Sequence, residues 1–222
     1  MRALTSLYVY EEITLLALRE EAGTVIGSST YPYAVAGALA AELLLAGRIR
    51  IEDSKRKLVD VVSDAPLGDP LLDDCLQRIK TARRRATLRD WVSRFSRIKN
   101  LKGRAAGSLC RRGILRVEEN AVLFIFQRKI YPEIVPGPER EIIARLRRAI
   151  FTDTRQVDAS TTGLLALAQS ADLLRVHFQR GELRARKARI KELTSGEAAG
   201  KATQEAIQAM HAAVIAAAAA GC

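Results

Sequence analysis

The sequence is poor in the residues on which most catalytic and metal sites depend. It has two histidines and three cysteines in 222 residues, and His177 and His211 lack the spacing of paired metal ligands. Cys75, Cys110 and Cys222 are odd in number and far apart, so they do not form a disulfide framework, which favours a reducing compartment. The glycine-rich phosphate loops GxGxxG and GxxxxGK[ST] and the GxSxG nucleophile motif are also absent from the sequence. We therefore expect a protein that is not an enzyme, with no catalytic residue, metal or cofactor.

Aromatic residues and long apolar runs are scarce as well. Aromatic residues make up 5% of the chain, which disfavours proteins that bind single strands by stacking bases on exposed rings. No stretch reaches the roughly 20 apolar residues of a membrane span, and the first residues lack the apolar core of a signal peptide. The alanine-rich stretch 206–220 is interrupted by Gln208 and His211, so we expect a packed terminal helix there. These absences predict a cytoplasmic protein.

Acidic residues are almost missing from one part of the chain. Lysine and arginine number 36 against 25 acids, for a net charge of +11. The segment 75–117 holds 14 basic residues and one acid, Asp90, so it alone carries +13. Such a charge favours a polyanionic partner: nucleic acid, an anionic membrane or an acidic protein. Lys99, Lys102 and Arg104 lie within two turns of each other and are candidates for binding a phosphate monoester.

Apolar periodicity predicts a mainly α-helical, single globular domain over residues 1–222, with short β-hairpins. Asp69 and Pro70 suit the N-cap and first position of a helix, and Trp91 is expected to face the core. Hairpin strands are expected at 48–52 with 58–62, and at 114–117 with 122–126 around a turn at 118–121. Helices are expected over residues 10–19, 34–46, from 70 onward, 87–95, 105–112, 139–151, 162–170, 172–178, 183–192 and 198–220.

Two carboxylate pairs and one histidine are candidates for chemistry. Adjacent residues on a helix point about 100° apart, so neither Glu11 and Glu12 nor Asp73 and Asp74 converge on one substrate. We interpret both pairs as stabilising helix N-termini. His177 stands in an apolar helical stretch, and we interpret it as a core histidine with a satisfied hydrogen bond.

The run Val122-Leu123-Phe124-Ile125-Phe126 is apolar at every position. This pattern fits a strand buried on both faces. It also fits a surface hairpin that enters lipid, and the neighbouring basic segment favours this second interpretation because charge attraction and modest apolar insertion add together.

Several motifs resemble those of the Golgi phosphoprotein 3 family. SDAPLGDPLLDD at 63–74 closely resembles the family's SDAPxGDxLLDE loop and helix. Supporting similarities follow the family's order: LYVYEEITLLAL at 7–18, ALAAELLLAGRI at 38–49, RGIL at 112–115 and YP at 131–132. The resemblance runs from about Leu4 into the C-terminal alanine-rich stretch and implies a helical bundle in a single domain. The composition, rich in alanine and arginine and poor in lysine, is typical of a bacterial member.

The resemblance also implies a function. Family members are peripheral proteins on the cytosolic face of a membrane, the Golgi in eukaryotes, where they bind phosphatidylinositol 4-phosphate. They act as adaptors that bind the cytosolic tails of membrane proteins. They also self-associate, and the hairpin, here Val122–Phe126, takes part in association and in lipid insertion.

The family's head-group pocket corresponds to this chain in part. Its basic run RNxRxR aligns with KNLKGR at 99–104, so Lys99, Lys102 and Arg104, with the neighbouring Arg97, are expected to bind an anionic phospholipid head group. The family's tryptophan and a further arginine align with Gly27 and Ala36, so the resemblance implies binding of phosphoinositide or another anionic lipid rather than the 4-phosphate alone. Tyr31 and Tyr33 are the nearest candidate rings.

Two other classes stay open. Basic helices beside a hairpin also suit a winged-helix-like nucleic-acid binder, which predicts tight duplex binding with a steep dependence on salt. A scaffold whose basic segment docks an acidic protein is the third class. Of the three, lipid binding is favoured and nucleic acid is disfavoured.

Overall fold

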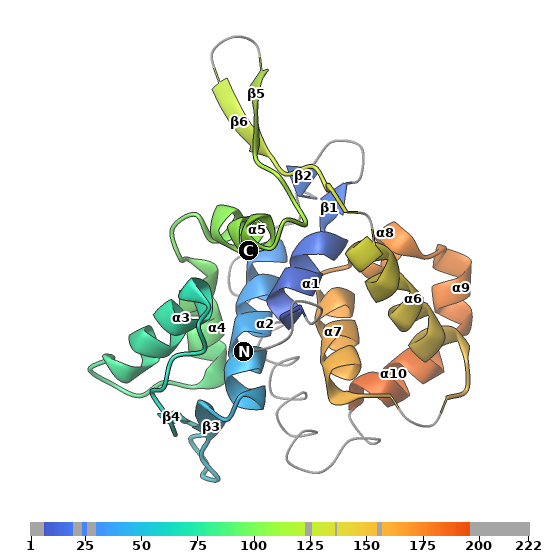
Figure 1. The fold of residues 1–222 in the computed structure, drawn as a ribbon. Coiled ribbons are helices and arrows are strands. Elements are labelled where there is room, and N and C mark those ends of the chain that lie inside the picture. Colours follow the sequence, from blue (N-terminus) through green and yellow to red (C-terminus); the bar gives the residue numbers. More distant parts are fainter. Residues whose placement is uncertain are drawn as a thin grey trace.

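Two central helices, α1 (Val9–Leu16) and α2 (Tyr31–Leu45), organise the computed structural model of the chain. The structure describes residues 7–19, 24–25, 30–122, 126–135, 137–154 and 157–195. Every residue of α2 from Ala34 to Leu43 is buried. A helix that is apolar all round is stable only when other elements cover every side, which explains why α2 lies at the centre of the molecule (Figure 1).

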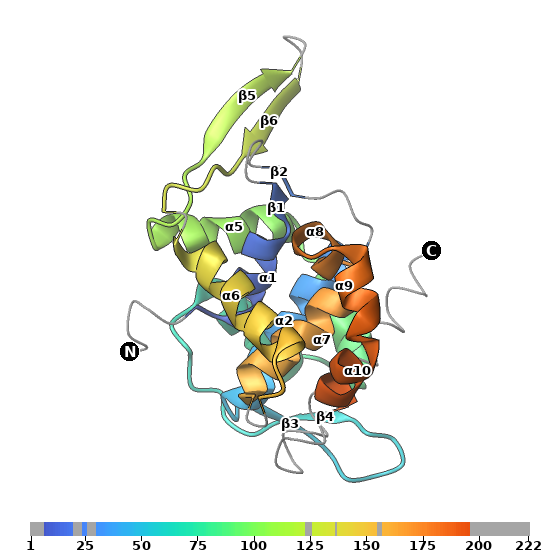
Figure 2. The same cartoon turned by 90° about the vertical axis from the view of Figure 1, so that its right-hand side faces the viewer.

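The other helices cover this centre from two sides (Figure 1). One side holds α3 (Pro70–Lys80), α4 (Leu88–Ser96) and α5 (Leu101–Arg111). The other side holds α6 (Gly137–Phe151), α7 (Ala159–Ser170), α8 (Leu174–His177), α9 (Arg180–Ala185) and α10 (Lys187–Ser195). Figure 2 looks onto this second side. Buried side chains from α1 to α10 form a continuous hydrophobic cluster.

The described strands form three antiparallel pairs. These are β1 (Leu18–Arg19) with β2 (Thr24–Val25), β3 (Ile49–Ile51) with β4 (Val59–Val61), and β5 (Glu118–Val122) with β6 (Phe126–Ile130). The fold is therefore mainly α-helical with short hairpins, as the sequence predicts. The β5–β6 ribbon projects away from the helical body beside α5 (Figures 1 and 2).

The predicted position of the last hairpin is wrong. The expected turn at 118–121 lies within β5, and the expected strand 122–126 is where β5 ends and β6 begins, with Val122 opposite Phe126. The pairing runs along the whole of β5, from Glu118 opposite Ile130 to Val122 opposite Phe126. A search for apolar runs misses this ribbon because β5 begins with the polar residues Glu118, Glu119 and Asn120.

The predicted residues of this hairpin lie at the edge of what the structure describes. Leu123, Phe124 and Ile125 lie outside the described residues, and of Val122 and Phe126 the structure describes the backbone alone. The expected first strand at 114–117 is also wrong, because Ile114 and Leu115 precede β5 and are buried in the body.

Local capping signals are confirmed. The Asp69 carboxylate accepts hydrogen bonds from the backbone N–H groups of Leu71 and Leu72 at 3.0 and 2.9 Å, at the start of α3. Trp91 is 3% exposed, as predicted for a core residue, and packs at a tilt against Phe95 with ring centroids 5.7 Å apart. These features could be predicted from the sequence because each depends on residues within about one helical turn of each other.

Several helix boundaries differ from the prediction. The helix expected over 10–19 ends at Leu16, and Leu18–Arg19 forms β1. α5 begins at Leu101 rather than at residue 105, after Asn100 in the left-handed conformation with φ 54°, which asparagine tolerates better than most residues. The expected helix 183–192 is two helices, α9 and α10, that meet at Arg186. The expected helix 198–220 lies outside the described residues.

Candidate functional site

The basic segment 75–117 folds into the end of α3, α4, α5 and their connections. Seven of its cations form ion pairs with carboxylates at 2.5–3.8 Å. The pairs are Arg78 and Arg104 with Asp74, Lys80 with Asp64, Arg85 with Glu52 and Asp60, Arg111 with Asp69, Arg112 with Glu11, and Arg116 with Glu118. Every one of these acids lies outside segment 75–117, so about half of its charge is neutralised within the fold.

Six other cations of the segment are exposed and form no ion pair with any described residue. They are Arg83, Arg84, Arg89, Arg94, Arg97 and Lys99, which we call the α4 surface. Arg83, Arg84 and Arg94 line a surface hollow of about 640 Å³ with Ala82. The Arg94 guanidinium lies over the Trp91 ring, 4.6 Å from its centroid, which holds one wall of the hollow by a cation–π contact.

The four predicted head-group residues divide between two environments. Arg97 and Lys99 are exposed in the connection between α4 and α5, and Lys102 is half-buried in the first turn of α5. Arg104 instead reaches α3, where Nη1 lies 2.5 Å from Asp74 Oδ2 and Nη2 donates to the Pro70 carbonyl at 3.3 Å. Burial raises the pKa of Asp74, but the hydrogen bonds from Arg104 and Arg78 outweigh it and leave that pKa below its usual value. Arg104 therefore fastens α5 to α3.

A buried polar network joins α1, α3 and α5. Ser108 Oγ donates to Glu11 Oε1 at 2.7 Å and lies 3.2 Å from Asp69 Oδ2. The Tyr10 hydroxyl donates to Asp69 Oδ2 at 2.8 Å, and Arg112 Nε lies 2.9 Å from Glu11 Oε1. Burial raises the pKa of Glu11, and burial together with the Asp69 charge raises that of Tyr10. The network satisfies groups that are costly to bury alone.

Glu11 and Glu12 do more than stabilise a helix N-terminus. Glu11 accepts from the Tyr8 backbone N–H at 2.9 Å, as a capping residue does. The two carboxylates diverge, as predicted, because Glu12 instead pairs with Arg145 of α6 at 2.7 Å. Burial raises the pKa of Glu12. The sequence interpretation missed that both are buried, since their partners lie on distant parts of the chain.

Asp73 and Asp74 also diverge. Asp73 accepts from the backbone N–H groups of Leu67 and Gly68 at 2.7 and 3.2 Å. Asp73 therefore holds the loop that precedes α3, while Asp74 forms an ion pair with Arg104 of α5. Their interpretation as stabilisers of a helix N-terminus is incomplete for Asp74, whose role is the ion pair with Arg104.

The remaining sequence candidates are structural. His177 Nε2 donates to the Leu16 carbonyl at 2.8 Å, which confirms the predicted satisfied hydrogen bond, but the residue is half-buried rather than in the core. Tyr31 is buried, burial raises its pKa to about 12, and its hydroxyl donates to Thr14 at 3.4 Å, so its ring does not face a ligand. Ala36 is fully buried within α2, and Gly27 lies outside the described residues.

In the parts of the chain that the structure describes, no three His, Cys, Asp or Glu side chains gather as metal ligands. Among the same residues, no helix has the length and apolar character to cross a bilayer.

Comparison with known proteins places these features in a family. A family model described as Golgi phosphoprotein 3 (GPP34) matches residues 9–210. The chain belongs to this family. The match runs from the first turn of α1 past the end of α10 and includes the SDAP loop, the buried network and the α4 surface, so the resemblance inferred from the motifs is confirmed.

A curated relative of this GPP34 protein is vacuolar protein sorting-associated protein 74 of Eremothecium gossypii. The two are 26% identical over 147 residues, which cover 57% of this chain and 44% of the relative. The alignment therefore spans less than half of the relative's length.

Proposed function

We propose that this GPP34-family chain is a non-enzymatic peripheral membrane protein that binds phosphoinositide or another anionic lipid through the α4 surface. Arg97, Lys99 and Lys102 contact phosphate groups, and Arg104 positions α5. The observation that carries the proposal is the set of six exposed cations that no described acid neutralises. A cation near an anionic membrane contributes about 1 kcal/mol of binding free energy, so such a set supports attachment without a spanning helix.

The β5–β6 ribbon supplies a second contact in this proposal. It stands out from the body beside α5 (Figure 1), and Val122 and Phe126 pair at its far end. The apolar run 122–126 then enters the lipid or meets a second copy of the chain. Charge attraction plus shallow apolar insertion is an effective combination for a protein that lies on a bilayer.

The family and the relative's name extend the proposal to a location and a role. Golgi phosphoprotein 3 is the family description, and the relative's name refers to vacuolar protein sorting. We place this chain on the cytosolic face of a membrane, the Golgi where the cell has one, as an adaptor that binds the cytosolic tails of membrane proteins and self-associates.

Vesicle co-sedimentation tests the lipid proposal. Vesicles contain phosphatidylcholine alone, or phosphatidylcholine with phosphatidylserine or with phosphatidylinositol 4-phosphate. We expect the chain to sediment with both anionic vesicles and to remain in solution with neutral ones. A double variant, Arg97→Gln with Lys99→Gln, should weaken binding about 30-fold, since two cations contribute about 2 kcal/mol.

The matched control neutralises two arginines on α6. Arg140 and Arg148 are exposed and form no ion pair with a described residue, and Arg140→Gln with Arg148→Gln removes the same charge from the opposite side of the molecule. An equal loss in this control would show that net charge alone drives binding, and would overturn the proposed surface. Failure to bind either anionic vesicle, or tighter binding to duplex DNA than to vesicles, would overturn the function.

A further inference from the structure

A second basic surface lies on α9 and α10. Arg180 and Arg184 are four residues apart on α9, and Lys187 and Lys191 are four residues apart on α10, the spacing that places two side chains on one face of a helix. All four are exposed and none forms an ion pair with a described residue. Nothing in the net charge of the chain outside segment 75–117 indicates this surface.

The acids near this surface are already engaged. Glu182 accepts from the Gln179 backbone N–H at 3.2 Å as part of the α9 cap. Glu192 pairs with Arg189 at 3.1 Å, and Asp172 pairs with Arg175 at 3.0 Å. Glu192 and Asp172 are therefore neutralised by other arginines, and Glu182 forms no ion pair with any of the four cations.

Three of the cations border a hollow of about 650 Å³ that has an apolar floor. Arg180, Arg184 and Lys187 form its basic edge, and Leu174, Leu183 and Ile190 line it as well. Asp172 also lines the hollow, where it is paired with Arg175. Leu174 and Ile190 are each 5% exposed, so they form the bottom of the hollow while the cations stand at its rim. The hollow thus combines positive charge with a concave apolar surface.

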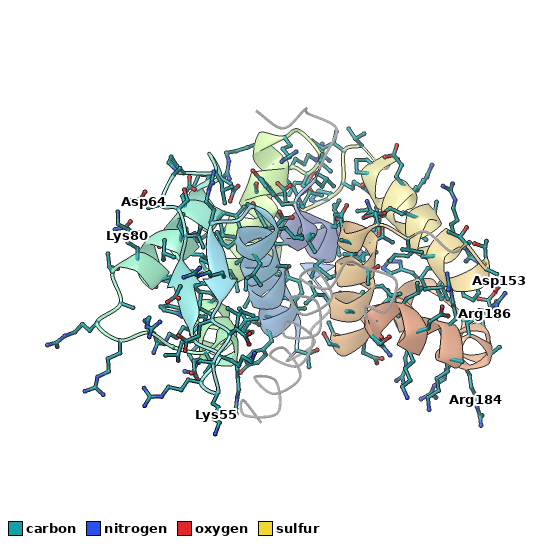
Figure 3. All side chains as sticks on the ribbon, turned by 90° about the horizontal axis from the view of Figure 1, so that it is seen from below. Lys55, Asp64, Lys80, Asp153, Arg184 and Arg186 are labelled. Atoms are coloured by element: carbon teal, nitrogen blue, oxygen red, sulfur yellow. The ribbon has the colours of Figure 1, made fainter. Side chains whose placement is uncertain are left out.

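This hollow is separate from the α4 surface. Figure 1 shows α9 and α10 on the side of α1, α2 and α7 opposite to α3 and α4. Figure 3, seen from below, shows Arg184 projecting at one end of the molecule and Lys80, at the end of α3, paired with Asp64 at the other. One molecule can therefore hold a ligand on each side at the same time.

We propose that the α9–α10 hollow binds an acidic peptide segment of a partner protein, with carboxylates on the rim cations and an apolar side chain on the floor. Arg180 and Arg184 of α9 and Lys187 of α10 line the same hollow, so an extended anionic ligand can contact several of them at once. The concave apolar floor favours a peptide over a membrane, whose anionic surface is flat, and over nucleic acid, whose outer surface is polar. Aliphatic and charged groups together are the recognition chemistry of peptide grooves.

Fluorescence anisotropy with labelled peptides tests this inference. The probes are three peptides of equal length: one of glutamate and leucine, one with glutamine in place of glutamate, and one with serine in place of leucine. We expect the glutamate–leucine peptide to bind at low salt and each replacement to weaken binding by about tenfold or more. Equal binding of all three, or none, would overturn the proposal.

Charge reversal locates the site. Arg184→Glu with Lys187→Glu should weaken binding of the glutamate–leucine peptide at least tenfold, while Arg140→Glu with Arg148→Glu on α6 leaves it within about twofold. Circular dichroism and thermal unfolding show whether each variant keeps its fold. An equal loss in both variants would overturn the assignment to this hollow.

Vesicle binding separates this inference from the proposed function. Arg184→Glu with Lys187→Glu should bind anionic vesicles like the unaltered protein, and Arg97→Gln with Lys99→Gln should bind the peptide normally. If the α9–α10 variant loses vesicle binding and not peptide binding, this surface contacts membrane and the peptide proposal is wrong. If the protein binds peptide and no vesicle, the proposed function fails and the peptide site remains.

Discussion

The contact between Tyr10 and Asp69 gives the sharpest test of how this fold is held together. Asp69 Oδ1 caps α3 through the backbone N–H groups of Leu71 and Leu72, while Oδ2 accepts the Tyr10 hydroxyl at 2.8 Å. Tyr10 is fully buried and Asp69 is 5% exposed. The variant Asp69→Ala therefore removes a cap and leaves a buried hydroxyl without its acceptor.

The cost of Asp69→Ala follows from these two losses. Loss of an N-cap costs about 1 kcal/mol, and a buried hydroxyl without its partner costs about 1–3 kcal/mol. The free energy of unfolding should fall by about 2–4 kcal/mol, a large part of the total of about 5–15 kcal/mol that is usual for a domain. In a Tyr10→Phe background the hydroxyl is gone, so Asp69→Ala should cost only about 1 kcal/mol for the cap.

A double-mutant cycle measures this difference by urea unfolding followed by circular dichroism. We expect a coupling energy of about 1–3 kcal/mol between Tyr10 and Asp69, the cost of the buried hydroxyl without its acceptor. The matched control is Asp158→Ala, which removes the N-cap of α7. The Asp158 carboxylate accepts the Thr161 N–H at 2.8 Å. This second cap has no bond to Tyr10, so its loss should be additive with Tyr10→Phe. A Tyr10–Asp69 coupling below about 0.5 kcal/mol would refute the reasoning.

Two further predictions concern buried carboxylates and the role of Arg104. Burial raises the pKa of Glu12 above the ordinary 4.5, so above pH 4.5 the folded state binds more protons than the unfolded state, and this group lowers stability as pH rises through that window. Glu12→Gln removes this dependence. In urea unfolding at several pH values, the free energy of unfolding of the unaltered protein minus that of the variant should therefore fall from pH 4.5 upward. A rise in this difference would contradict a raised pKa for Glu12. Arg104→Gln breaks the ion pair with Asp74 and should lower the free energy of unfolding by about 1 kcal/mol. Its binding to anionic vesicles should fall less than that of the double variant Arg97→Gln with Lys99→Gln. An equal fall would show that Arg104 itself contacts lipid.

Local features of the fold could be predicted from the sequence because their causes are local. Asp69 before Pro70 marks the start of α3, and the apolar stretch 34–46 identifies the buried α2. In each case the residues that decide the structure lie within a few positions of each other.

Contacts between distant residues could not be predicted in this way. Tyr10 and Asp69 are 59 positions apart, and Glu11 and Ser108 are 97 positions apart. A single serine within α5 has no sequence signal that indicates a buried carboxylate partner from α1. The predicted hairpin position was wrong because the apolar run 122–126 suggested a strand, whereas β5 ends and β6 begins within that run.

The distribution of charge shows why a count along the chain misplaces a binding surface. Cations near the body, such as Arg104 and Arg112, pair with the acids Asp74 and Glu11 from other elements. Charge neutralised in this way stabilises the fold and is screened from a ligand, so it contributes little to the attraction of a partner. On the other side of the molecule, Glu192 and Asp172 pair with Arg189 and Arg175, and Arg184 and Lys187 have no described counter-ion. A segment of +13 and a remainder of −2 therefore produce two exposed basic surfaces on opposite sides of the molecule, for which we propose separate partners.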